Sequence, residues 1–94
     1  MWFVYLLLCD NKTFYIGITN NVKSRLNKHK NKQSLHTKKF SNLKLVYCEC
    51  YKNKFEAAKR ERQLKGWSHV KKQMLVNLKI NDPHYIELVE VIRG

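Results

Sequence analysis

The chain of 94 residues has room for one domain with a modest core, and its 44% hydrophobic and 12% aromatic content is globular rather than disordered. Its formal net charge is +12, and residues 23–72 hold sixteen of the nineteen basic residues but only three of the seven acidic ones. This density of positive charge indicates a nucleic-acid partner, because each neutralised phosphate releases condensed counterions; a merely soluble basic surface and an anionic membrane surface are the alternatives.

The start of the chain and its cysteines argue against a membrane or secreted protein. The apolar stretch over residues 1–8 falls short of the roughly 18 residues that a spanning helix needs, and it lacks the basic lead-in and cleavage site of a secretion signal. Cys9, Cys48 and Cys50 form no C-x-x-C pair. Three unpaired cysteines indicate reduced thiols in a cytoplasmic protein rather than a disulfide framework or a zinc site.

A β-hairpin is expected at the beginning of the chain. Residues 2–9 are a continuous apolar run rich in aromatic side chains, which predicts a buried strand. The polar residues 10–12 predict a turn, and the β-branched and aromatic residues 13–19 predict the returning strand. Three residues in the turn would place Cys9 opposite Thr13.

The remaining elements alternate between helix and strand. A helix begins after residues 20–21 and fades over residues 30–34, a loop follows, and residues 43–51 predict a third strand. Two further helices are expected over residues 54–65 and 69–80. Gly66 is placed to end the first of them and Ser68 to cap the second. The side chains expected to face inward from the last helix are Val70, Met74, Leu75 and Leu78.

The order ββαβαα predicts a mixed α/β (α+β) fold with a small antiparallel sheet and helices packed against it. No repeat or linker divides the chain, so residues 1–94 are expected to form a single domain. Residues 81–83 break the last helix and begin a tail over residues 81–94, in which residues 85–92 are apolar enough to pack back on the domain.

Two tyrosines of the hairpin are candidate site residues. With Cys9 opposite Thr13, Tyr5 pairs with Gly17 and the side chains of Tyr5, Tyr15 and Gly17 share one face of the sheet. Gly17 then leaves a hollow beside the two phenols, where a ligand could approach closely. An aromatic pair in the core is an equal alternative, and a shift of one residue in the turn would separate the three side chains.

Two side chains of the first helix are suited to phosphate chemistry. Arg25 and His29 are four residues apart and lie on one face of the helix, beside an apolar stripe formed by Val22 and Leu26. Arginine can bind phosphate through two parallel hydrogen bonds, and histidine exchanges a proton near neutrality. A solvated pair on the helix surface is the alternative.

Glu61 is the candidate metal ligand. On a helix over residues 54–65 its neighbours three and four residues away are Ala57, Ala58 and Leu64, so the carboxylate projects from an apolar arc. An inward carboxylate needs a cation, either a metal or an arginine such as Arg25, and spacing alone leaves both open. Together, one inward carboxylate, two tyrosines, an arginine and a histidine in a basic domain suggest metal-assisted phosphodiester hydrolysis.

These motifs resemble the GIY-YIG nuclease superfamily, in particular its small single-domain bacterial branch. Phe3-Val4-Tyr5 followed by Tyr15-Ile16-Gly17 is similar to the signature that names the family. Arg25-x-x-x-His29 looks like the family's helix motif, and Glu61 looks like its metal-binding glutamate. The tract Lys65-Gly66-Trp67-Ser68, followed by Lys71-Lys72, is typical of the branch, and the resemblance covers residues 2–80.

The resemblance implies a three-stranded antiparallel sheet and one divalent cation, Mg²⁺ or Mn²⁺, on Glu61. It also implies that a tyrosine positions or deprotonates the attacking water while Arg25 steadies the phosphate. Ile18 occupies a position where repair-type relatives carry a lysine, so His29 is the expected activator of the tyrosine. His36 matches a loop histidine of homing-type relatives, and Gln73 stands where several branches carry an asparagine.

The function expected from the sequence is a metal-dependent DNA endonuclease in DNA repair or recombination. The alternatives are a non-catalytic nucleic-acid-binding module on the same fold and a basic structural or ribosome-associated protein. Because no separate DNA-binding domain is expected, specificity would come from loops, DNA structure, a homodimer or a protein partner. The residues expected to bind the nucleic acid are His36, Lys38, Lys39, Lys71 and Lys72.

Overall fold

The structure, a computed structural model, describes residues 1–79 and contains six elements in the predicted order. They are β1 (Trp2–Cys9), β2 (Thr13–Thr19), α1 (Val22–Lys30), β3 (Leu43–Tyr51), α2 (Lys54–Lys65) and α3 (His69–Lys79). The strands form an antiparallel sheet in the order β2-β1-β3, which confirms the predicted fold class. The predicted tail and its packing lie outside the described residues.

The hairpin has the predicted register. Cys9 pairs with Thr13, Leu7 with Tyr15 and Tyr5 with Gly17. The turn requires a positive φ at Asp10 (51°) and Asn11 (58°), which asparagine and aspartate tolerate better than other side chains except glycine. The turn chemistry therefore fixes which side chains of β1 and β2 share a face.

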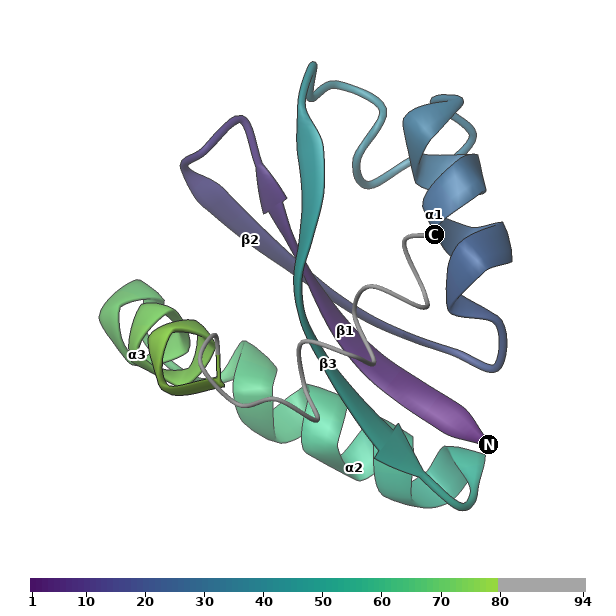
Figure 1. The fold of residues 1–94 in the computed structure, drawn as a ribbon, viewed down its shortest axis with the longest axis vertical. Helices are drawn as coiled ribbons and strands as arrows, with labels where there is room; N and C mark the ends of the chain where they lie inside the picture. Colours follow the sequence, from purple (N-terminus) through teal and green to yellow (C-terminus); the bar gives the residue numbers. More distant parts are fainter. Residues whose placement is uncertain (80–94) are drawn as a thin grey trace.

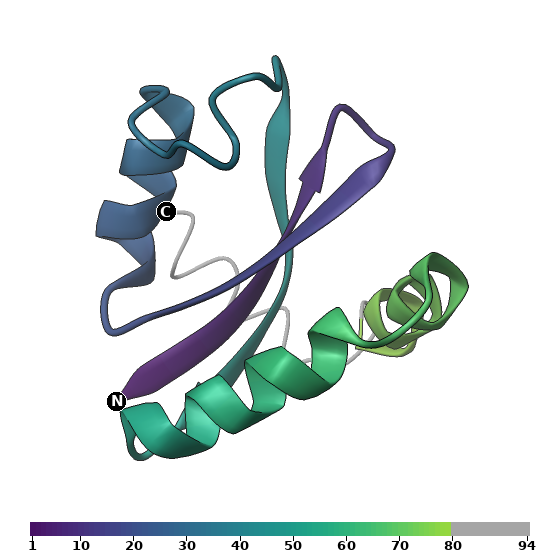
Figure 2. The same cartoon turned by 180° about the vertical axis from the view of Figure 1, so that it is seen from behind.

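The sheet is covered on both faces, which Figures 1 and 2 show from opposite sides. One face of β1 carries Tyr5, Leu7 and Cys9, which pack in one buried cluster with Val22 and Leu26 of α1. The opposite face is covered by α2, whose buried side chains form a second cluster with β1 and β2. Members of this second cluster are Val4, Leu6, Ile16, Tyr47, Ala57, Leu64 and Val76.

A β-bulge changes the face alternation within β3. Leu6 pairs with Tyr47 but Leu7 pairs with Leu45, so Val46 is an extra residue in β3. As a result Leu45 and Cys48, three residues apart, both lie in the cluster against α1. The bulge also sends Tyr47 into the cluster against α2, on the same parity as Glu49.

Helix α3 presents a different face from the one predicted. Val70, Met74 and Leu78 are 67%, 58% and 77% exposed, whereas Val76 is buried and Leu75 is half-buried. The hydroxyl of Ser68 caps α3 as predicted. The helix begins directly after the turn at the end of α2 and contacts the sheet mainly at β3, so the turn sets which side chains reach the core. The prediction that Val70, Met74 and Leu78 face inward was therefore wrong, whereas Leu75 does pack against the core.

The loop between α1 and β3 is fastened at its end by the hairpin turn. The Asp10 carboxylate accepts hydrogen bonds from the backbone amides of Ser41 (3.0 Å) and Asn42 (2.7 Å), and the Asp10 amide donates to the Asn42 carbonyl (2.8 Å). Farther back in the loop, the Lys32 ammonium donates to the Phe40 carbonyl. These bonds hold the loop over residues 31–42 beside α1, where Figure 1 shows it.

Candidate active site

The two hairpin tyrosines face α1 from neighbouring strands. Tyr5 is fully buried in β1 and Tyr15 is half-buried in β2, and their ring centroids are 6.3 Å apart, as expected for diagonal neighbours in this register. The ring of His29 approaches both tyrosines from α1, at 5.9 Å from Tyr5 and 5.2 Å from Tyr15. Three rings from three elements thus meet on one face of the sheet.

Gly17 does not leave an open hollow. A Cβ at this position would lie 2.5 Å from the Tyr5 hydroxyl oxygen and 2.7 Å from its ring carbon Cζ. The space predicted for a ligand is filled by the Tyr5 ring itself, because direct cross-strand pairing lays that ring over the glycine backbone. Gly17 is therefore a close-approach glycine for Tyr5, and its φ is not positive.

His29 is held by two side-chain hydrogen bonds. Its Nε2 lies 3.0 Å from the Tyr5 hydroxyl, and its Nδ1 lies 2.6 Å from the hydroxyl of Thr37 in the loop. Burial lowers the pKa of His29, and the nearby Arg25 and His36 lower it further. The ring is therefore neutral near physiological pH and can both donate and accept a hydrogen bond.

Arg25 and His36 border the tyrosine pair. Burial raises the pKa of both phenols, and the positive charge of Arg25 opposes this effect at both. A hydrogen bond from Arg25 also lowers the pKa of Tyr5. The exposed His36 stacks on Tyr15 with ring centroids 6.1 Å apart and an interplanar angle of 29°. Arg25 thus favours the ionised form of both phenols.

Glu61 lies on α2, which packs on the opposite face of the sheet from the Tyr5 ring. Its side chain is 19% exposed and forms an ion pair with Lys65 at 3.6 Å, so the arginine partner considered from the sequence is not the one observed. The Glu61 charge nevertheless raises the pKa of Tyr15, which lies on the edge strand β2. The Glu61 carboxylate therefore influences Tyr15 through its negative charge.

The surroundings of Glu61 fit a hard, well-hydrated cation. Within residues 1–79 no group of three or more histidine, cysteine or acidic side chains could enclose a metal ion. Mg²⁺ is commonly held by one or two carboxylates while keeping several waters, whereas a structural zinc site needs four protein ligands. Glu61 offers one partly exposed carboxylate, an oxygen ligand of the kind that such an ion accepts.

The predicted nucleic-acid-binding residues belong to two separate regions. Lys38 and Lys39 lie in the loop beside α1, whereas Lys71 and Lys72 lie on α3 at the other end of the molecule (Figures 1 and 2). Lys71 stacks over the Trp67 ring at 4.3 Å. Gln73 donates a hydrogen bond to Asn77 on its own helix (2.9 Å).

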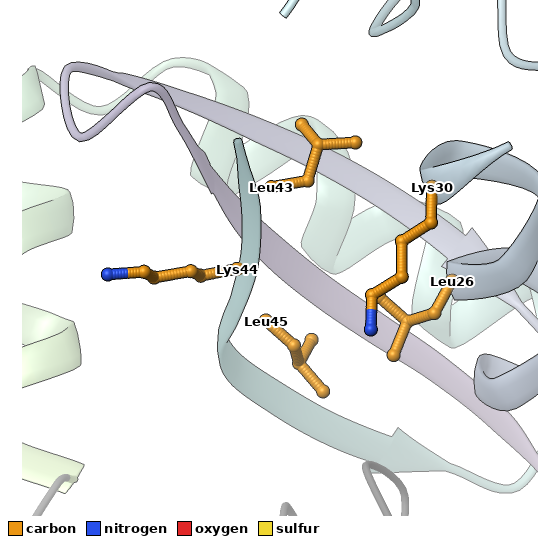
Figure 3. A pocket seen from close by; sticks show the side chains of 5 residues that line it. All are labelled: Leu26, Lys30, Leu43, Lys44 and Leu45. Carbon is orange, nitrogen blue, oxygen red and sulfur yellow. The ribbon is translucent and has the colours of Figure 1, made fainter. Parts of the chain in front are cut away.

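A pocket of about 340 Å³ lies between α1 and the start of β3, away from the rings described above. Figure 3 shows that Leu26, Leu43 and Leu45 point toward one another there, with Lys30 alongside and Lys44 extending away. None of these side chains is a predicted site residue, and the lining offers only one charged group directed at the space. The pocket is not the candidate active site.

Sequence patterns did not reveal Thr37. Its side chain is fully buried and bonds to His29, yet it lies in a loop, where no periodicity distinguishes a buried position from an exposed one.

The ion pair between Glu49 and Arg60 was also missed. The Arg60 guanidinium donates to both Glu49 oxygens, at 2.9 Å to Oε1 and 3.0 Å to Oε2. Tyr47 and Tyr51 donate their hydroxyls to the same carboxylate. This cluster ties β3 to α2 next to Glu61 in the chain, and its sequence signal was the alternation of Tyr47, Glu49 and Tyr51 along the predicted strand.

Comparison with known proteins agrees with this arrangement. The family model described as the GIY-YIG catalytic domain matches residues 1–73, a range that contains every residue of the candidate site. The chain belongs to the GIY-YIG family.

Relatives of similar length place the chain within a branch of the GIY-YIG family. A UPF0213 protein of Desulfotalea psychrophila is 38% identical over 77 residues, covering 80% of this chain and 70% of that protein. A UPF0213 protein of Clostridium perfringens is 36% identical, covering 90% and 94%. The solution structure of a UPF0213 protein from Bacillus halodurans has a TM-score of 0.55 at 34% identity, covering 89% of this chain and 90% of that one.

None of the helices within residues 1–79 has the length and apolar composition that a membrane span requires.

Proposed function

We propose that this GIY-YIG protein is a metal-dependent endonuclease that hydrolyses phosphodiester bonds of DNA. The observation that carries the proposal is that the rings of Tyr5, Tyr15 and His29 lie together, with every pair of ring centroids within 6.3 Å. The charges of Arg25 and Glu61 both act on Tyr15. Two tyrosines that share a face with a neutral histidine, one of them influenced by both a cation and an anion, favour a proton-handling site over an inert core.

Tyr15 is the better placed of the two tyrosines to act on water. It is half-buried, whereas Tyr5 is 1% exposed and covered by its neighbours. Arg25 lowers the pKa of Tyr15 against the effect of burial, and Tyr5 provides a hydrogen bond that acts in the same direction. In this assignment Tyr15 orients the water or accepts its proton, and Arg25 stabilises the charge that develops on the phosphate.

Glu61 would hold the divalent cation, Mg²⁺ or Mn²⁺, together with waters and phosphate oxygens. The bound ion would supply Lewis-acid stabilisation of charge on the phosphate. Because Glu61 is the one carboxylate assigned to the metal among the described residues, the affinity of the free protein for metal should be weak and should improve when DNA supplies further oxygens. Glu61→Gln preserves the shape of the side chain and removes its charge.

The basic surface would hold the DNA backbone. The net charge of +12 and the exposed lysines of the loop and of α3 favour contact with phosphates over recognition of base sequence. Since the two lysine regions are separate, we propose that DNA structure, a homodimer or a protein partner adds specificity, in a cytoplasmic role in DNA repair or recombination.

A cleavage screen tests the proposal. Duplex, nicked, flapped, branched and single-stranded DNAs are incubated with the protein and Mg²⁺ or Mn²⁺, with Glu61→Gln as control. We expect cleavage by the wild type, none by Glu61→Gln, and DNA binding retained or tightened in that variant because a negative charge near phosphate is gone. Failure to cut any substrate would favour the non-catalytic binding module. Equal cleavage by Glu61→Gln would contradict the assigned metal ligand.

A further inference from the structure

The buried hydroxyl of Thr37 contacts His29, which in turn contacts Tyr5. Thr37 lies in the loop between α1 and β3, its side chain is fully buried, and its Oγ1 lies 2.6 Å from Nδ1 of His29. The other ring nitrogen, Nε2, lies 3.0 Å from the Tyr5 oxygen. A neutral imidazole carries one proton, so one of these contacts uses a histidine donor and the other a histidine acceptor.

The hydroxyl proton of Thr37 decides between the two tautomers. Among the residues described, the structure gives this hydroxyl one hydrogen-bond partner, which is Nδ1 of His29. If Nδ1 carried the ring proton, the threonine proton would point into the protein interior with no acceptor. An unmet buried donor is costly, so donation from Thr37 to Nδ1 is favoured.

The hydrogen bonds of Tyr5 agree with this choice. Arginine can only donate, so the hydrogen bond from Arg25 that lowers the pKa of Tyr5 uses the Tyr5 oxygen as its acceptor. With the proton of His29 on Nε2, the same oxygen accepts a second bond on its other lone pair. The phenol proton of Tyr5 is then directed to Tyr15, whose ring centroid lies 6.3 Å from that of Tyr5 and whose pKa a hydrogen bond from Tyr5 lowers.

We propose that Thr37 is a positioning residue whose hydroxyl fixes the ring proton of His29 on Nε2 and so directs a chain of donors from Thr37 through His29 and Tyr5 to Tyr15. If every hydrogen bond ran in the opposite direction, Tyr15 would donate its hydroxyl proton to Tyr5. The observed arrangement leaves the oxygen of Tyr15 as the final acceptor. The effect of Thr37 on catalysis rests on the proposed nuclease function, whereas the direction of the hydrogen bonds does not.

The tautomer is measurable without any cleavage assay. Ring-nitrogen NMR of the ¹⁵N-labelled protein at near-neutral pH separates the protonated, pyrrole-type nitrogen from the pyridine-type one, and a His29→Gln variant assigns the signals among the four histidines. We expect Nε2 of His29 to be the protonated nitrogen. A proton on Nδ1 in the wild-type protein would overturn the inference.

Substitution at Thr37 tests the consequence. Thr37→Val keeps the shape and removes the hydroxyl, so we expect a mixture of His29 tautomers and a kcat lowered by roughly tenfold with KM little changed, which corresponds to about 1.4 kcal/mol on the barrier. Thr37→Ser restores the hydroxyl and should restore both the Nε2–H signal and kcat. An unchanged tautomer in a folded Thr37→Val protein would contradict the assigned role.

A matched control separates positioning from folding. Thr19→Val removes another buried threonine hydroxyl, whose partner is the backbone of Asn21, and should leave the His29 signals unchanged. If Thr19→Val alters the His29 tautomer as much as Thr37→Val does, a general packing effect explains both results and the assigned role of Thr37 is contradicted. A protein with the expected tautomer that cuts no DNA would refute the proposed function while leaving the geometry of Thr37 standing.

Discussion

Replacement of Gly17 by alanine should damage the centre of the candidate site. The added Cβ would lie 2.5 Å from the Tyr5 oxygen and 2.7 Å from its Cζ, whereas ordinary contacts between such atoms need about 3.5–4.0 Å. The Tyr5 ring must therefore shift by about 1 Å. Tyr5 is 1% exposed and its oxygen bonds to His29 at 3.0 Å, so a shift of this size breaks the bond or displaces the histidine.

The expected cost is about 2 kcal/mol of unfolding free energy, since overpacking a well-packed core typically costs 1–3 kcal/mol. For a domain of this size that lowers the Tm by roughly 10 °C. Denaturant unfolding of purified Gly17→Ala and wild-type protein measures the difference. In a DNA cleavage assay the same variant should be strongly impaired, because Tyr5 and His29 no longer meet.

Gly66→Ala is the matched control. Its Cβ would meet its nearest atom, the Gln63 carbonyl oxygen, at 3.4 Å, and the backbone of Gly66 is right-handed helical. We expect its stability to stay within about 0.5 kcal/mol of the wild type. Equal stability of the two alanine variants would refute the reasoning, because it would mean that the Tyr5 ring does not lie over Gly17.

Three further outcomes are expected. Burial raises the pKa of Glu49, but hydrogen bonds from Arg60 and two tyrosines outweigh this effect and hold the pKa below its ordinary value of 4.5. The ionised Glu49 therefore stabilises the folded protein above pH 4.5, and this stabilisation is lost as the pH falls through the lowered pKa. Acid unfolding should therefore show a smaller pH dependence in Arg60→Met than in the wild type, and equal curves would contradict this. Arg25→Ala should abolish cleavage while DNA binding measured by fluorescence anisotropy persists, and full activity would remove Arg25 from the site. Affinity for DNA should fall steeply with rising salt concentration. Joint replacement of Lys38, Lys39, Lys71 and Lys72 should weaken binding to all DNA sequences alike, and binding that does not depend on salt would exclude a phosphate-dominated mode.

Local patterns in the sequence determined the elements and the hairpin register. A three-residue turn after Cys9 predicts the pairing of Cys9 with Thr13 that the structure has, and side-chain alternation then places Tyr5 and Tyr15 together. The helical spacing of Arg25 and His29 likewise fixed their common face. These features depend on residues close in the chain, and their motifs were enough to predict the GIY-YIG family.

Tertiary structure alone decided the contacts between distant segments. Thr37 reaches His29 because the hairpin turn fastens the end of its loop, and no spacing within the loop indicates which hydroxyl is buried. The apolar residues of α3 likewise did not reveal that Val76 is buried while Val70, Met74 and Leu78 are exposed. Such contacts depend on how whole elements pack, and packing energies are summed over the entire domain rather than encoded in any local window.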